Sequence, residues 1–262
     1  MTLLFALAGC TFTPGTEGFT TLDSAALTGG WEAEDPALPQ ILREDGTTIT
    51  ITSASLQPAW LSLQSISGAG STFDPADPPE GYGLCHSGHC HRDDGALVDY
   101  VDIQAELAGG DLTFEDVVTW SGLEVDLLDP TEQDLGDPSP SPHLPIVALR
   151  QLEVGFPDDA PGLLIEGQLT GDTFEAPTPL VVELPVVEPW VGGMDLTVDR
   201  TQAPEVAVTI ALALDETLFD GVPLAPDGES AEVVLDDPDD PAAQVLLENL
   251  LALEPDLDWT ER

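Results

Sequence analysis

Val206–Leu214 reads VAVTIALAL, an apolar, partly β-branched run that is long enough for a strand in the middle of a sheet. Similar short runs recur along the chain, separated by proline, glycine and aspartate. The predicted strands are Thr47–Thr52, Trp60–Ile66, Ile146–Val154, Gly162–Leu169, Leu180–Val187, Met194–Val198, Pro204–Leu214 and Ala231–Leu235. Strands at this spacing, with turn residues between them, are typical of a sandwich. We therefore predict a mostly all-β fold, an antiparallel β-sandwich.

One helix is predicted near the C-terminal end, at residues 241–254. Asp239-Asp240-Pro241 supplies a cap, an acidic first turn and a proline at a position that helices tolerate. The apolar positions that follow are Val245, Leu246, Leu250 and Leu253. Pro255 then ends the helix, which we expect to close one end of the sandwich. The segment Val98–Leu107 fits either a strand or one short helix.

The chain opens with MTLLFALAGC, an apolar run that ends in Leu7-Ala8-Gly9-Cys10. This ending resembles the lipobox of bacterial lipoproteins. The resemblance implies a signal peptide at residues 1–9, lipidation of Cys10 and a lipid-anchored place in the bacterial cell envelope, at the outer membrane. Residues 10–30, rich in threonine and glycine, are then predicted to be a lipidated tether, followed by a single β-sandwich domain at 31–262. The alternative for the first residues is a buried apolar terminus.

The composition is strongly acidic and limits the classes of partner. There are 50 acidic residues against five basic ones, and the formal net charge is −45. Such a surface has no basic face for phosphates, so we expect no nucleic acid partner and no membrane contact beyond the lipid anchor. A hydrophobic content of 42% argues against a disordered chain. No GxSxG or HExxH motif is present, and we do not expect an enzyme.

The densest chemistry lies in Cys85–His91, which reads CHSGHCH. Ser87-Gly88 is typical of a two-residue hairpin turn, with glycine supplying a positive φ. Such a turn would pair His86 with His89, Cys85 with Cys90 and Leu84 with His91. Because directly opposed residues share a face, the three histidines would lie on one face and the two cysteines on the other. The cysteines would then be close enough for a disulfide.

Three converging imidazoles suit copper or zinc, and a nearby carboxylate suits an oxygen ligand or a partner for a ring N–H. The predicted metal-site residues are His86, His89, His91, Asp93 and Asp94. Three alternatives stay open: a disulfide-stapled turn in a structural or adhesive surface lipoprotein, thiolate ligation by the cysteines, and a covalent c-type haem for electron transfer. The haem alternative depends on Cys85, Cys90 and His91, which match a spaced variant of the attachment motif.

Three further stretches resemble extracytoplasmic copper-binding β-sandwich proteins of the methanobactin-associated periplasmic type. They are Trp60-Leu61-Ser62-Leu63, then Val206–Leu214, and then Leu218-Phe219-Asp220-Gly221-Val222. The resemblance implies copper binding on a sandwich outside the cytoplasm. The Cys85–His91 cluster departs from that family, so the resemblance assigns no ligand positions. With a metal-binding function we also expect a metal-delivery partner protein.

Overall fold

The protein is mostly β, and the predicted fold class is confirmed. The structure, a computed structural model of the chain, describes residues 20–33, 35–36, 38–67, 75, 78–86, 89–108, 113–145, 147–174, 176–198, 205–225 and 232–262. Cys10, the predicted signal peptide and the Ser87-Gly88 turn therefore lie outside the described residues. Within these ranges the strands form four sheets, most of whose pairings are antiparallel.

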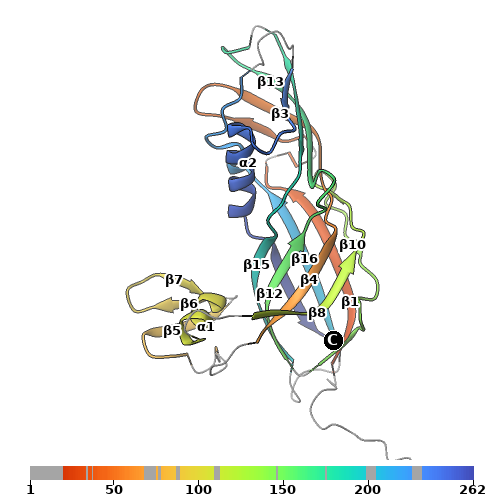
Figure 1. Cartoon of the computed structure of the whole chain (residues 1–262), viewed down its shortest axis with the longest axis vertical. Coiled ribbons are helices and arrows are strands. Elements are labelled where there is room, and N and C mark those ends of the chain that lie inside the picture. The colour runs from red at the N-terminus through yellow and green to blue at the C-terminus, as the bar shows by residue number, and fades with distance from the viewer. Residues whose placement is uncertain are drawn as a thin grey trace, which may run out of the picture.

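Two of these sheets pack together in one half of the molecule, the lower half in the orientation of Figure 1. The first has the order β10-β1-β16-β18, with β11 also paired to β1. Its strands are β1 (Thr20–Trp31), β10 (Gln133–Asp134), β11 (His143–Leu144), β16 (Glu205–Leu214) and β18 (Asp256–Glu261). The second has the order β15-β12-β4-β8. Its strands are β4 (Trp60–Ser67), β8 (Thr113–Ser121), β12 (Val147–Gly155) and β15 (Trp190–Val198).

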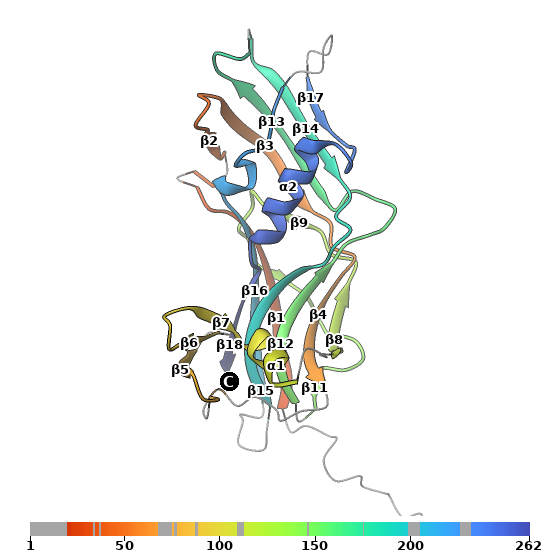
Figure 2. The same ribbon diagram turned by 60° about the vertical axis from the view of Figure 1, so that its left-hand side comes forward.

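A third sheet occupies the other half, with helix α2 beside it (Figure 2). Its order is β17-β14-β13-β3-β2, with β9 also paired to β3. Its strands are β2 (Gln40–Leu42), β3 (Thr48–Leu56), β9 (Val125–Asp126), β13 (Leu163–Thr170), β14 (Thr178–Leu184) and β17 (Val233–Leu235). The helical elements of this half are η1 (Glu216–Phe219) and α2 (Pro241–Ala252). One continuous hydrophobic core runs through both halves.

Helix α2 begins where it was predicted and ends two residues earlier, at Ala252. The carboxylate of Asp240 accepts a hydrogen bond from the Ala242 N–H at 2.7 Å, which satisfies one of the free donors of the first turn. At the other end, the Trp190 indole donates to the Leu253 carbonyl. Asn249 donates to the carbonyls of Leu218 and Asp220, and this ties the helix to η1.

The VAVTIALAL run forms β16, a central strand, as predicted. It pairs antiparallel with β18 on one side and parallel with β1 on the other. Its alternate residues from Val206 to Leu214 are buried, because one face of the strand points into the sandwich. The parallel pairing with β1 was not predicted.

The predicted tether is wrong from residue 20 onwards, since Thr20–Trp31 forms strand β1. Its buried positions include the small residues Thr20, Ala25 and Gly29, and a register shift between Leu22 and Ser24 interrupts the alternation that marks a strand. Gly29 belongs to this packing, because a Cβ there would collide with the carbonyl oxygen of Asp126 in β9.

The fourth sheet and one helix come from an insertion, residues 68–112, between β4 and β8. Ser67 at the end of β4 pairs with Thr113 at the start of β8, so the two ends of the insertion lie side by side. Its elements are β5 (Tyr82–His86), β6 (His89–Arg92), β7 (Leu97–Asp99) and α1 (Tyr100–Ala108). The ambiguous segment is thus mainly a helix. Figures 1 and 2 show this small sheet to one side of the sandwich.

Candidate metal-binding hairpin

Strands β5 and β6 form the predicted hairpin. Cys85 pairs with Cys90 and His86 pairs with His89. The two cysteines are joined by a disulfide, and their Cα atoms are 4.0 Å apart. The predicted disulfide is therefore present. Because both sulfurs are used in it, neither thiolate ligation nor a thioether-linked haem is compatible with this form of the protein.

The register beyond the cysteines differs from the prediction. Leu84 was expected opposite His91, but the pairing shifts between Tyr82 and Cys85, and Tyr82 pairs with Arg92. The extra residue is a β-bulge, which changes the faces on which residues lie. As a result Tyr82 and Cys85, three positions apart, both pack on the inner side, while Leu84 is 68% exposed.

The inner side of the hairpin is a small core of its own. Cys90, Tyr100 and Ile103 are buried together, and Tyr82, Cys85 and Val98 pack against them. Tyr100 and Ile103 belong to α1, so the helix covers the cysteine side of the small sheet. The histidine side is therefore the outer side.

On that outer side, His89 and His91 lie two residues apart on β6, with ring centroids separated by 5.8 Å and planes tilted by 52°. His91 is exposed and His89 is half-buried. The pairing of β6 with β7 places Leu97 opposite His91 and Asp99 opposite His89. His86 pairs with His89 in the backbone, but its side chain is outside the described atoms.

The two predicted carboxylates belong to the turn between β6 and β7. Asp94 accepts hydrogen bonds from Arg92 Nε and from the Ala96 N–H, both at 3.0 Å. The bond from Arg92 holds the pKa of the Asp94 carboxyl below its usual value. Asp93 is exposed. Among the described side chains, no three histidine, cysteine, aspartate or glutamate residues are gathered closely enough to hold a metal ion as they stand. The structure thus brings two of the predicted ligands together, and it does not bring Asp94 to them.

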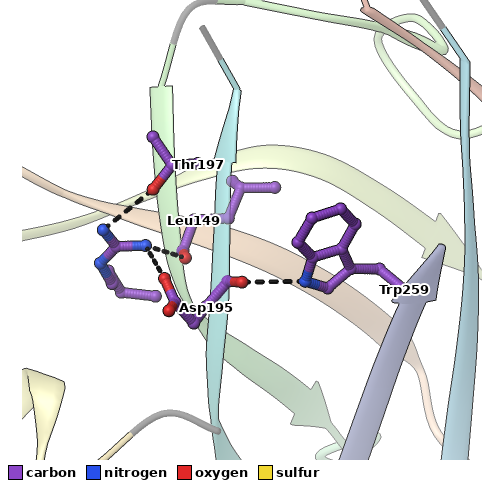
Figure 3. A network of polar contacts seen from close by, with 5 residues as sticks. Leu149, Asp195, Thr197 and Trp259 are labelled. Atoms are coloured by element: carbon purple, nitrogen blue, oxygen red, sulfur yellow. Dashed lines mark hydrogen bonds and ion pairs between the residues drawn. The ribbon is translucent and has the colours of Figure 1, made fainter. Parts of the chain in front are cut away.

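A buried cation anchors the insertion to the sandwich, and the sequence analysis missed it. Arg150 on β12 is almost fully buried and donates to Asp195, to Thr197 and to the Leu149 carbonyl, at 2.9, 3.1 and 3.0 Å (Figure 3). The main-chain carbonyl of Asp195 also accepts from the Trp259 indole at 2.9 Å. The only sequence signal was a single arginine within an apolar strand.

The same guanidinium lies over the ring of Tyr100, with its carbon 5.9 Å from the ring centroid. Burial raises the pKa of Tyr100 to about 12, and the charge of Asp195 adds to this effect. Tyr100 is the first residue of α1, so this contact connects the small core of the hairpin to the sandwich. The fold therefore holds the hairpin from behind and leaves its histidine side open.

The fourth histidine and the described methionine, which could also bind copper, belong to elements outside the hairpin. His143 lies on β11, where its Nδ1 is 3.1 Å from the Thr21 hydroxyl, and Met194 is buried in the core of the sandwich. The chemistry available on the described part of the hairpin is therefore that of two imidazoles, one exposed and one half-buried, without free sulfur. No helix in the described part of the chain is long and apolar enough to cross a membrane. Comparison of the whole chain with known protein families, with curated proteins and with solved structures found no match.

Proposed function

We propose that this protein is an extracytoplasmic metal-binding protein that holds a divalent copper or zinc ion on its histidine hairpin. The ligands would be His86, His89 and His91, with the Cys85–Cys90 disulfide fixing the hairpin behind them. The observation that carries the proposal is the placement of His89 and His91 on one exposed face, with ring centroids 5.8 Å apart. Imidazole is the side chain that copper and zinc share as a ligand.

The donor set favours Cu(II) and Zn(II) over Cu(I). Soft Cu(I) prefers thiolate and thioether ligands, but both cysteines of the hairpin are in the disulfide and Met194 is buried. The disulfide and the small core behind the hairpin support the proposal, because they fix the backbone that carries the ligands and so reduce the conformational freedom lost on binding. The charge of −45 also raises the concentration of cations around the protein. We propose no catalysed reaction.

A disulfide is typical of compartments outside the cytoplasm, and this agrees with a place in the bacterial cell envelope. We propose a lipid anchor on Cys10 at the outer membrane, and a partner protein that delivers or receives the metal. The Cys10→Ser variant should lose acylation and partition into the aqueous phase on detergent phase separation. A variant that partitions with the membrane like the parent would contradict the anchor and leave the metal site untouched.

The metal site is tested with the His89→Ala/His91→Ala double variant. It should bind Zn(II) or Cu(II) far more weakly than the parent in chelator competition, with a melting temperature changed only slightly, because His91 is exposed, His89 is half-buried, and neither belongs to the small core. The matched control is His143→Ala, which removes the same side chain elsewhere and should leave metal binding unchanged. Equal binding by parent and double variant would refute the site.

A second candidate, a surface module for adhesion, is favoured by two exposed leucines of the small sheet. Leu84 on β5 and Leu97 on β7 are 68% and 60% exposed, and large exposed apolar side chains suit a contact with another protein. If the purified parent binds neither zinc nor copper, this second candidate replaces the first.

A further inference from the structure

We infer that Asp99, rather than Asp93 or Asp94, is the carboxylate ligand of the proposed metal site. The inference rests on the proposed function and extends it by one residue. It comes from the pairing of β6 with β7, which puts Asp99 directly opposite His89. The carboxylates predicted from the sequence, Asp93 and Asp94, follow His91 along the chain. Asp99, in contrast, lies beside His89 on the neighbouring strand of the sheet.

The geometry of an antiparallel pair sets the distances. Directly opposed residues have Cβ atoms roughly 4.5–5.5 Å apart and point to the same side of the sheet. His89 therefore has Asp99 as its neighbour across the strands and His91 as its neighbour along β6. Asp99 and His91 are therefore both neighbours of His89 on the outer face of the small sheet. The donors of the three residues are two imidazole nitrogens and one carboxylate, a combination that zinc and Cu(II) accept.

The side on which Asp99 points is fixed by its two neighbours in the chain. Val98 pairs with Cys90 and packs into the small core, and Tyr100 is buried in it. Residues alternate faces along a strand, so Asp99 points outward, in agreement with its exposure. Both neighbours hold the backbone of Asp99 in place, and this keeps its carboxylate near His89.

Asp93 and Asp94 lack this position. Asp94 is engaged by Arg92 and by the Ala96 N–H within the turn. Asp99, His89 and His91 are not gathered around a common point as they stand, so binding requires rotation of their side chains about χ1 and χ2. Asp99 and His91 are exposed, and exposed side chains change rotamer within picoseconds to nanoseconds.

The experiment compares Asp99→Asn with Asp93→Asn in zinc competition and in the absorption spectrum of bound Co(II). Each variant removes one negative charge from the same small sheet, so general electrostatic attraction falls alike in both. Asp99→Asn should raise the Kd for zinc by about tenfold or more, a loss typical of a missing partner at a metal site. Asp93→Asn should change it by less than about threefold, because an exposed charge away from the metal is screened by salt. Asp99→His should restore tight binding, because it returns a ligand to the same position.

The outcomes separate this inference from the proposed function. If His89→Ala/His91→Ala abolishes binding while Asp99→Asn and Asp93→Asn bind equally well, the histidine site stands and Asp99 is not a ligand. If the parent binds neither zinc nor Cu(II), both are overturned. A Co(II) spectrum that is altered by Asp99→Asn and left unchanged by Asp93→Asn would support coordination by Asp99.

Discussion

Replacing Arg150 with methionine tests whether one buried cation holds the insertion to the sandwich. Methionine keeps an unbranched apolar chain and removes the guanidinium. The variant leaves Asp195, Thr197 and the Leu149 carbonyl without their donor, and it removes the cation above the Tyr100 ring. The expected effect is a loss of stability centred on the contact between β12 and α1.

The expected magnitude depends on burial. Removing one partner of a buried ion pair lowers the free energy of unfolding by about 3–5 kcal/mol, because the remaining buried charge is left without a partner. The Arg150 side chain is 7% exposed and that of Asp195 is 31% exposed, so Asp195 keeps some contact with water. We therefore expect the lower end of that range, about 3 kcal/mol. At 5.9 Å the contact with Tyr100 is near the limit for a cation–π interaction, and it should contribute about 0.5–1 kcal/mol of the total.

The assay is urea unfolding followed by tryptophan fluorescence, since Trp259 donates to Asp195 and reports on this region. The matched control is Arg262→Met, which breaks another arginine–aspartate pair with the same 2.9 Å separation from Asp23 but with side chains 54% and 41% exposed. It should lose less than about 1 kcal/mol. A double-mutant cycle with Tyr100→Leu isolates the contribution of the ring. Equal losses for the two arginine variants would refute the anchor.

Three further predictions follow from the same packing. Replacing residues 68–112 with a two-residue turn should leave the sandwich folded and abolish metal binding, because β4 and β8 are paired at the ends of the insertion; an unfolded circular dichroism spectrum would contradict this. A Cβ at Gly155 would overlap the Trp60 indole, so Gly155→Ala should lower the free energy of unfolding by about 1–3 kcal/mol, while Gly30→Ala, which meets no atom, should not. Because its folded pKa is raised to about 12, the Tyr100 phenol keeps its proton longer in the folded state; stability from this group should be intact below about pH 10 and lost as the pH rises towards 12. The tyrosinate absorbance of the parent should include an ionisation near pH 12 that is missing from Tyr100→Phe, and a parent curve without that ionisation would refute it.

Four strands of the sandwich, β4, β12, β15 and β16, could be predicted wholly or in part from the sequence, because they carry apolar or alternating runs, whereas β1 and β8 were not predicted. β16 and β12 were predicted within a residue or so of their ends. β18 was missed because it has only two large apolar side chains, Leu257 and Trp259, among acids and threonine. Its place in the sheet comes from pairing with β16, a contact that no local pattern encodes.

The hairpin shows where local prediction stops. The turn and the symmetric cysteines fixed the pairing of Cys85 with Cys90, because a two-residue turn determines the register next to it. The β-bulge between Tyr82 and Cys85 could not be predicted. It places both side chains on the same side, where they pack against residues of α1, and the hairpin sequence alone does not encode that packing. The partner of His89 across the sheet depended on β7, a strand of three residues that the sequence left ambiguous.

The parallel pairing of β1 with β16 sets when this part of the sheet can form. Thr21 is opposite Glu205 and Trp31 is opposite Leu214, so this pairing waits for most of the chain to be synthesised, whereas the shorter pairings of β1 with β10 and β11 need only residues up to 144. At about 5–20 residues per second this delay is on the order of ten seconds. A strand that waits so long is exposed to other nascent chains, but β1 is rich in threonine, alanine and glycine and carries an aspartate, a composition that makes it a poor template for aggregation. The small and polar residues that make β1 hard to recognise in the sequence therefore also lower its tendency to aggregate before β16 is made.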